Sequence, residues 1–117
     1  IAEIPNLMPQ IEQISQKYGI KIPVYGHAGD GNLHLTLVKN PESTMEEWYA
    51  TEDKALREVY MATCEMGGTI SGEHGIGSKR SKYLNLTCSA GEIKIMKDIK
   101  RVFDPNGIMN PGKIFPE

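Results

Sequence analysis

The stretch Gly26-His27-Ala28-Gly29-Asp30-Gly31-Asn32-Leu33-His34 decides the fold, because it joins two apolar-rich runs at residues 24–28 and 33–38. Runs of this kind, separated by a short glycine-containing segment, are typical of a β-hairpin. Asp-Gly is a favoured pair for a two-residue type I′ turn, so we predict the turn at Asp30 and Gly31.

This register places one histidine on each strand, directly opposite the other. His27 would pair with His34, and opposed side chains share a face with Cβ atoms about 4.5–5.5 Å apart. Tyr25 and Thr36 fall on the same polar face. The core-facing side would carry Val24, Gly26, Ala28, Leu33, Leu35 and Leu37. Two imidazoles so placed can chelate one metal ion. The alternative is a solvated hairpin whose histidines have no function.

Length, charge and cysteine content limit the class of protein. A chain of 117 residues is expected to form one domain, residues 1–117, and its net charge is −2. Basic residues are scattered, which argues against a nucleic-acid partner, and no apolar run approaches the roughly 20 residues of a membrane span. Cys64 and Cys88 fit no zinc spacing, so we expect reduced thiols and a cytoplasmic location. Ile1 in place of a starting Met predicts either removal of a segment by processing or a piece of a longer chain.

The remaining pattern predicts helices around the hairpin. Apolar spacing and a following glycine indicate a helix over residues 6–18, and the hairpin occupies residues 20–39. A long helix is expected from residue 43 or 44 to 65, a short strand at 69–71 and a short helix at 78–84. The last helix begins at residue 89 and ends before Asp104. The fold class is therefore α+β, a small antiparallel sheet with helices packed on one face.

Capping signals and apolar faces define the two main helices. Three pairs fit the capping-box pattern, namely Ser43 with Glu46, Thr44 with Glu47, and Ser89 with Glu92. The long helix is expected to bury Trp48, Ala55, Leu56, Val59, Tyr60 and Thr63. The last helix is expected to bury Ile93, Met96, Ile99, Val102 and Phe103.

A second candidate site is Gly72-Glu73-His74-Gly75-Ile76-Gly77, where three glycines let the backbone turn sharply or approach a ligand. Three interpretations are open. A phosphate loop is disfavoured, because the glycine spacing is not a dinucleotide fingerprint and no Walker lysine is in register. A structural turn with two solvated polar residues is the second interpretation. The third joins this loop to the hairpin as a metal centre.

In the third interpretation His27, His34 and Glu73 form a two-histidine, one-carboxylate set that leaves positions open on the metal. Such a set suits Zn²⁺, Mn²⁺ or Fe²⁺. Adjacent residues on a strand point to opposite faces, so we expect Glu73 to bind the metal and His74 to stand beside it as an acid or base. An imidazole is well suited to proton transfer near neutral pH.

Three motifs occur together and in one order: residues 26–34, residues 68–77 and the stretch Phe103-Asp104-Pro105-Asn106-Gly107-Ile108-Met109-Asn110-Pro111-Gly112-Lys113. With this arrangement the chain, from about Pro23 to its end, resembles the C-terminal part (cap plus tail) of FAD-linked oxidases of the vanillyl-alcohol oxidase type. The branches it resembles most are the D subunit of glycolate oxidase, D-lactate dehydrogenase and D-2-hydroxyglutarate dehydrogenase.

The resemblance implies roles for the residues of the first two motifs. His27, His34 and Glu73 match the family's divalent-metal ligands, and His74 matches its catalytic base. Thr36 stands where some relatives carry an Asn that helps to hold the substrate. The Thr36 side chain is shorter than that of Asn, so the resemblance does not identify the substrate.

The implied reaction is the oxidation of a D-2-hydroxy acid, of the glycolate or D-lactate type, to a 2-oxo acid. The implied cofactors are FAD and a divalent metal (Zn, Mn or Fe). The metal would polarise the substrate hydroxyl, His74 would take its proton, and hydride would pass to the flavin. Asn110 belongs to the terminal Asn-Pro-Gly-Lys, which in relatives approaches the flavin.

The family's flavin-binding domain lies upstream of these motifs, and nothing in the chain corresponds to it. Residues 1–117 would therefore be a C-terminal domain fragment that folds alone and does not turn over. Expected partners are a small 2-hydroxy acid, the missing domain, other oxidase subunits, and a second copy paired through an exposed sheet edge. A stand-alone metalloenzyme with the same ligands and a non-catalytic structural module remain as alternatives.

Overall fold

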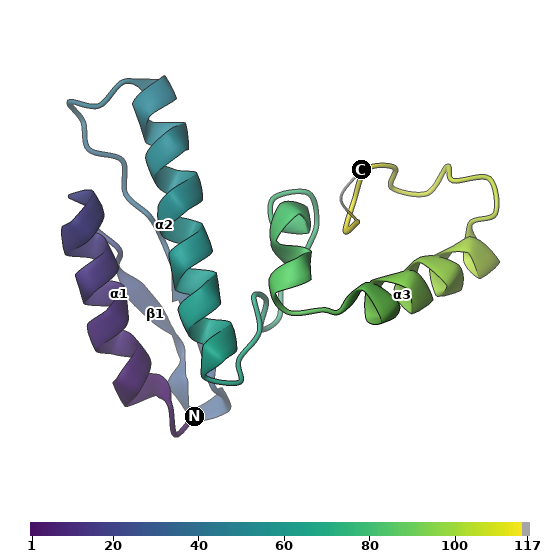
Figure 1. The fold of residues 1–117 in the computed structure, drawn as a ribbon, viewed down its shortest axis with the longest axis horizontal. Coiled ribbons are helices and arrows are strands. Elements are labelled where there is room, and N and C mark those ends of the chain that lie inside the picture. Colours follow the sequence, from purple (N-terminus) through teal and green to yellow (C-terminus); the bar gives the residue numbers. More distant parts are fainter. Residues whose placement is uncertain (116–117) are drawn as a thin grey trace. The chain divides into compact units, whose positions relative to one another are not determined.

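The computed structural model describes residues 1–115 of the chain (Figure 1). It contains two compact units, Ile1–Gly68 and Thr69–Glu117, and the last two residues of the second lie outside the described part. The first unit holds two helices and an antiparallel strand pair, and the second holds a 3₁₀ helix and an α-helix. This arrangement confirms the α+β class. No helix within residues 1–115 is long and apolar enough to cross a membrane.

Helix α1 spans Ile4–Tyr18 and buries its predicted apolar face, which consists of Leu7, Ile11 and Ile14. It begins two residues earlier than predicted, because Pro5 occupies its first turn, where a missing backbone N–H costs nothing. The helix ends at Gly19, which takes a left-handed conformation with φ 62°. That ending agrees with the sequence, since glycine adopts this conformation without a steric penalty.

Helix α2 spans Met45–Glu65 and begins with the capping box of Thr44 and Glu47. The Glu47 N–H donates to the Thr44 hydroxyl at 3.2 Å, and the Thr44 N–H donates to the Glu47 carboxylate at 2.8 Å. Of the two competing pairs in the sequence, the later one is therefore used. The buried face is Trp48, Ala55, Val59 and Ala62. The predicted face was broader and partly wrong, because Leu56, Tyr60 and Thr63 are only half-buried beside this stripe.

The core of the first unit lies between the two helices and the hairpin. Helices α1 and α2 contact each other, and Figure 1 shows both of them beside the strands. The buried cluster joins the α1 and α2 stripes to Ile20 and Ile22. Val24, Leu33, Leu35 and Leu37 of the hairpin pack against it. Both helices thus cover the apolar face of the hairpin, as predicted.

The hairpin has a different register from the predicted one. Strand β1 is Val24–His27, β2 is Asn32–Leu35, and His27 pairs with Asn32 while His34 pairs with Tyr25. The loop is a 3₁₀ turn over Ala28–Asp30 followed by Gly31 at φ 74°, so it holds four residues instead of two. A type I′ turn requires positive φ at both central residues. Within the described residues only Gly31 of that pair has it, so the predicted turn does not form.

The two registers differ by two residues in the pairing, which preserves the faces of the strands. A shift by one would have moved every apolar side chain to the solvent side. Val24 and Leu35 still pack on the helices, and His27 and His34 still share the polar face. The same register extends to an isolated bridge between Lys21 and Val38. The apolar pattern therefore selects the face, and the loop conformation selects the pairing.

Replacing Gly26 with alanine is expected to destabilise the first unit strongly. Gly26 has φ 137°, and a Cβ built on it would lie 2.6 Å from the Asn32 carbonyl oxygen and 3.0 Å from the His34 ring. Backbone strain and overpacking together predict a loss of about 3 kcal/mol in the free energy of unfolding. Urea denaturation followed by circular dichroism measures it.

Gly19→Ala is the matched control for this substitution. Gly19 also has positive φ, at 62°, but a Cβ there would meet nothing within 4 Å. Gly19→Ala should lower the free energy of unfolding by about 1 kcal/mol, which is the cost of the left-handed backbone alone. Equal losses for the two variants would contradict the close approach of the strands at Gly26.

The second unit is built around a 3₁₀ helix, Ser81–Leu86, whose Tyr83 and Leu84 are buried. The prediction of an ordinary helix at 78–84 is therefore shifted by about three residues. The strand predicted at 69–71 is wrong, because these residues have no strand conformation. A strand needs a partner, and the described part of this unit provides no other strand. Ile70 is nevertheless buried, with 4% of its surface exposed.

Helix α3 spans Ala90–Phe103 and begins with the predicted capping box of Ser89 and Glu92. Its predicted burial is wrong, because no residue of α3 is buried. Val102 and Phe103 are each 77% exposed, and Ile99 is 55% exposed. The apolar periodicity correctly indicates a helix, whereas burial also requires a covering surface, which the described residues do not form over α3.

Candidate functional site

The hairpin brings His27 and His34 together on its polar face. His27 ends β1 and is exposed, and His34 lies in the middle of β2 and is half-buried. Their ring centroids are 6.4 Å apart, with the rings edge to face. The histidines are thus diagonal neighbours, not the directly opposed pair that the sequence predicted. Diagonal neighbours on one face of a strand pair remain within reach of large side chains.

Tyr25 and Thr36 flank this histidine pair. The Tyr25 ring stacks on His34 with centroids 5.5 Å apart and 25° between the planes, which limits the rotation of the imidazole. Thr36 follows β2 directly and is exposed, and its hydroxyl lies 3.4 Å from the Tyr25 hydroxyl. Its backbone N–H donates to Pro23, so the strand pairing continues to this point. The candidate substrate residue therefore stands on the edge of the histidine face.

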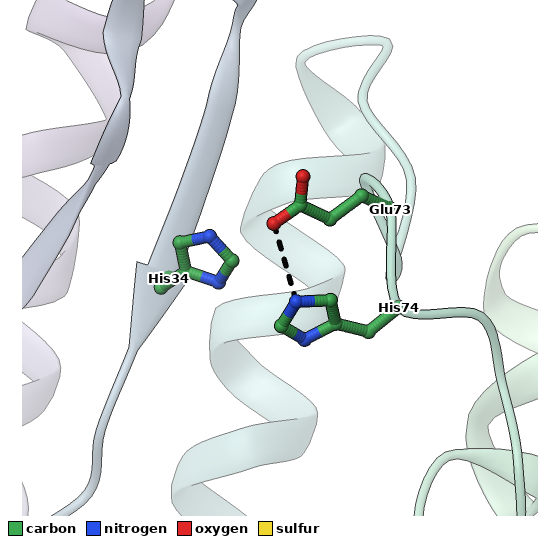
Figure 2. A group of neighbouring side chains, drawn as sticks. All are labelled: His34, Glu73 and His74. Atoms are coloured by element: carbon green, nitrogen blue, oxygen red, sulfur yellow. Dashed lines mark ion pairs between the residues drawn. The ribbon is translucent and has the colours of Figure 1, made fainter.

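Glu73 and His74 lie in the glycine-rich loop, outside any regular element. Figure 2 shows the contact between them, in which the His74 Nε2 lies 3.2 Å from the Glu73 Oε1. The strand geometry that we expected to separate the two side chains is absent, which is why they can meet. Both side chains are largely exposed, at 64% for His74 and 45% for Glu73. A carboxylate at this distance orients the imidazole, and it has a second oxygen that could bind a cation.

Hydrogen bonds to two of its backbone carbonyls hold this loop in place. Gly75 and Gly77 both have positive φ, at 72° and 56°, which explains why glycine occupies these positions. The Arg80 guanidinium donates to the Gly75 carbonyl at 3.2 Å, and the Ile114 N–H donates to the Gly77 carbonyl at 2.7 Å. The loop that carries Glu73 is therefore tied both to the segment that follows it and to the C-terminal tail.

Asn110 lines a pocket of about 420 Å³ between α3 and the tail. Ile99, Phe103 and Met109 also line the pocket, and Lys113 adds a basic residue to its lining. Asn110 itself has φ 49°, a left-handed conformation that asparagine tolerates better than most residues. A largely apolar pocket with a few polar groups is a common form of ligand site.

Sequence reasoning gave Asp104 no functional role, although it named the residue as the end of the last helix and as part of the third motif. Asp104 is 6% exposed, so its carboxylate is a buried ionisable group next to the Asn110 pocket. A signal for it was present, because Lys100 precedes it by four residues on the helix and forms an ion pair with it at 2.5 Å. The sequence alone did not indicate that the carboxylate is buried.

The family model "FAD linked oxidases, C-terminal domain" matches residues 1–114 of the chain. The chain is similar to the glycolate oxidase subunit GlcD of Bacillus subtilis, with 41% identity over 97% of this chain and 24% of that protein. It is 38% identical to the D-2-hydroxyglutarate dehydrogenase of Stutzerimonas stutzeri, over 98% of this chain and 25% of the relative. The D-lactate dehydrogenase of Anaerostipes hadrus is 39% identical over 96% of this chain and 23% of its own length.

These matches confirm the resemblance carried by the three motifs. The chain spans about a quarter of the length of the relatives that it matches. Their names describe enzymes that act on glycolate, D-lactate and D-2-hydroxyglutarate, so the chain is part of an enzyme family. By its match along residues 1–114, the chain belongs to the family of C-terminal domains of FAD-linked oxidases.

Proposed function

We propose that the chain is the substrate- and metal-binding C-terminal part of an FAD-dependent oxidoreductase. Its reaction would convert a D-2-hydroxy acid, of the glycolate or D-lactate type, to a 2-oxo acid. The observation that carries this proposal is the pair of imidazoles held on one polar face of the hairpin. The family match and the substrates named for three relatives support the same chemistry.

The residues fit a divalent cation by the chemistry of their donor atoms. His27 and His34 provide nitrogen ligands whose rings are already neighbours, with Tyr25 stacked on one of them. Glu73 provides a carboxylate on a loop with a fixed backbone. Two histidines and a carboxylate with open positions suit Zn²⁺, Mn²⁺ or Fe²⁺ and leave room for a substrate oxygen.

His74 would act as the catalytic base. A bound cation would supply Lewis-acid polarisation of the substrate hydroxyl, and FAD would supply the hydride acceptor for the α-carbon. The His74 imidazole would take the hydroxyl proton, with Glu73 fixing the orientation of the ring. Thr36, on the edge of the histidine face, would contact the substrate. Asn110, which lines the pocket between α3 and the tail, would contact the flavin.

The proposal also covers the partners of the chain. The upstream flavin-binding part would complete the enzyme, so the chain alone should not reduce flavin. Each of the two strands has a single strand partner within the described residues, so each has an edge at which another chain could pair. We further predict contact with other oxidase subunits, pairing of two copies at such an edge, and a cytoplasmic location.

Metal analysis of the chain tests the proposal. The chain purified without added metal or an affinity tag should hold about one divalent ion, because two neutral imidazoles and a carboxylate bind such ions tightly. The variant with His27→Ala and His34→Ala should lose it. Mass spectrometry of the washed protein measures the content.

Two other outcomes would contradict the proposal. If both proteins lack metal and neither Zn²⁺ nor Mn²⁺ raises the melting temperature of the unsubstituted chain, the histidines have a structural role only. If the metal-loaded chain converts a substrate without flavin, the chain is a stand-alone metalloenzyme.

A further inference from the structure

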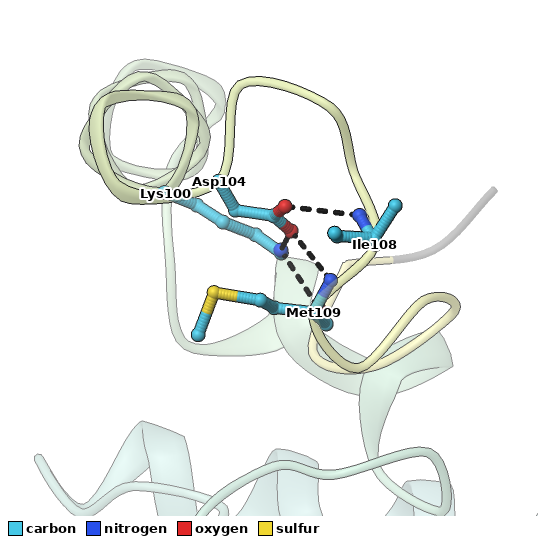
Figure 3. Close-up of polar contacts among 4 residues, drawn as sticks. All are labelled: Lys100, Asp104, Ile108 and Met109. Carbon is cyan, nitrogen blue, oxygen red and sulfur yellow. Dashed lines mark hydrogen bonds and ion pairs between the residues drawn. The ribbon is translucent and has the colours of Figure 1, made fainter.

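The carboxylate of Asp104 is the centre of a hydrogen-bond network that joins α3 to the C-terminal tail (Figure 3). Its Oδ1 accepts the Ile108 N–H at 2.9 Å, and its Oδ2 accepts the Met109 N–H at 3.0 Å. The Lys100 ammonium donates to the same Oδ2 at 2.5 Å and to the Met109 carbonyl at 3.0 Å. Both backbone polar groups of Met109, the residue before Asn110, are thus held, the N–H by Asp104 at the C-cap of α3 and the carbonyl by Lys100 within α3.

This network requires Asp104 to be ionised. The Lys100 ammonium lowers the pKa of Asp104 below its ordinary value of 3.8, and the two backbone N–H donors act in the same direction against the effect of burial. Only 3% of the Asp104 side chain is exposed. At neutral pH the carboxylate therefore accepts from three donors at once, and hydrogen bonds to a charged acceptor are stronger than neutral ones.

The other end of the same tail segment is also held. The Ile114 N–H donates to the Gly77 carbonyl in the glycine-rich loop. Ile114 has φ 72°, a conformation that a β-branched residue rarely adopts unless surrounding contacts impose it. The turn from Asn110 to Lys113 is therefore fixed on one side by Asp104 and on the other by the loop that carries His74.

We propose that Asp104, supported by Lys100, is a positioning residue that holds Asn110 in the wall of its pocket for contact with the flavin. The proposal rests on the proposed function, in which Asn110 approaches that cofactor. Asp104 itself would touch neither substrate nor flavin. Its effect would pass through the backbone of Met109, which is one residue away from Asn110.

Hydrogen exchange of the chain tests whether Asp104 fixes the tail. Asp104→Ala should speed exchange of the Ile108 and Met109 amides by about tenfold or more, because each loses a charged acceptor. Asp104→Asn keeps the size and one acceptor oxygen, so it should have an intermediate effect. Asp98→Ala is the matched control, because Asp98 lies on the same helix. Its described ion pairs are with Lys94 and Arg101, whose side chains are exposed. The control should leave the exchange rates of the Ile108 and Met109 amides unchanged.

A flavoenzyme carrying this chain tests whether the fixed tail matters for the reaction. We define the grafted flavoenzyme as the Bacillus subtilis GlcD relative with its matching C-terminal segment replaced by this chain. Asn110→Ala and Asp104→Ala should each slow flavin reduction by about 10- to 100-fold, the scale of a small misplacement of a reacting group. Both should shift the flavin absorbance spectrum. The double variant should be no slower than the slower single one, because the two residues act through one contact.

The outcomes separate the two claims. If Asn110→Ala changes neither rate nor spectrum, the contact of Asn110 with the flavin is wrong, and so is the role assigned to Asp104. If Asn110→Ala has the expected effect and Asp104→Ala does not, only the positioning role is wrong. The role would also be overturned if the rate losses of the two single variants multiply in the double variant. Unchanged amide exchange at Met109 in Asp104→Ala would overturn it too. A Km change without a change in rate or spectrum would contradict it as well.

Discussion

Replacing His74 with glutamine in the grafted flavoenzyme should slow flavin reduction by a D-2-hydroxy acid about 100- to 10,000-fold, the usual contribution of a general base. Glutamine keeps much of the length and hydrogen-bonding capacity of the side chain but cannot take a proton. The loss should therefore fall on the rate at saturating substrate, with little change in metal content. Anaerobic stopped-flow absorbance of the flavin measures this rate.

Lys79→Gln is the control for this substitution. Lys79 lies five residues further along the same segment and is exposed, so its replacement should change the rate by less than about threefold, as for most exposed charges. A His74→Gln enzyme that keeps its full rate, with flavin and metal bound, would show that another group takes the proton.

Replacing Glu73 with glutamine should have the second large effect, on the cation. The amide is similar in shape but lacks the negative charge that binds a divalent ion. Because loss of an outer-shell partner alone weakens binding by about 10- to 100-fold, removal of a direct ligand should weaken it by about 100-fold or more. Flavin reduction should fall with it, and excess metal should restore part of the rate. Equilibrium dialysis with Mn²⁺ or Zn²⁺ measures the affinity.

Glu46→Gln is the matched control, because Glu46 is an exposed carboxylate in the first turn of α2, outside the capping box. Its metal affinity and rate should equal those of the unsubstituted enzyme. Unchanged affinity in Glu73→Gln would remove the carboxylate from the ligand set and leave the two histidines as the remaining candidates.

The hairpin shows which parts of a local structure can be predicted from sequence. Alternation of apolar and polar residues assigned Val24 and Leu35 to the core and His27 and His34 to the polar face, and the structure agrees. The pairing was wrong, because Asp-Gly is compatible with several turns and the choice depends on the φ of Asp30. Faces follow from burial, which is a strong constraint, whereas turn type follows from small local energy differences.

The helices show a similar division. The starts of α2 and α3 and the end of α1 were predictable, because Thr44, Ser89 and Gly19 act within one turn of the chain. The burial of α3 was not, because burial depends on residues distant in sequence. Val102 and Phe103 have the spacing of a core face and are exposed in this chain.

The candidate site was partly accessible to sequence reasoning. Residue types and order pointed to His27, His34, Glu73 and His74, and the structure gives each pair a defined mutual geometry. The role of Asp104 was not accessible, because its partners are backbone groups of a tail that turns back onto α3. The pattern of residue types in the sequence does not indicate that the tail turns back in this way.

The central claim is that this chain serves the oxidation of D-2-hydroxy acids by FAD. Anaerobic addition of D-lactate or glycolate to the grafted flavoenzyme, followed by flavin absorbance, tests it most directly. The account predicts bleaching of the flavin by at least one of these acids, no bleaching by L-lactate, and none when His27 and His34 are both alanine. A grafted flavoenzyme that holds FAD and metal and stays oxidised with glycolate, D-lactate and D-2-hydroxyglutarate would contradict it.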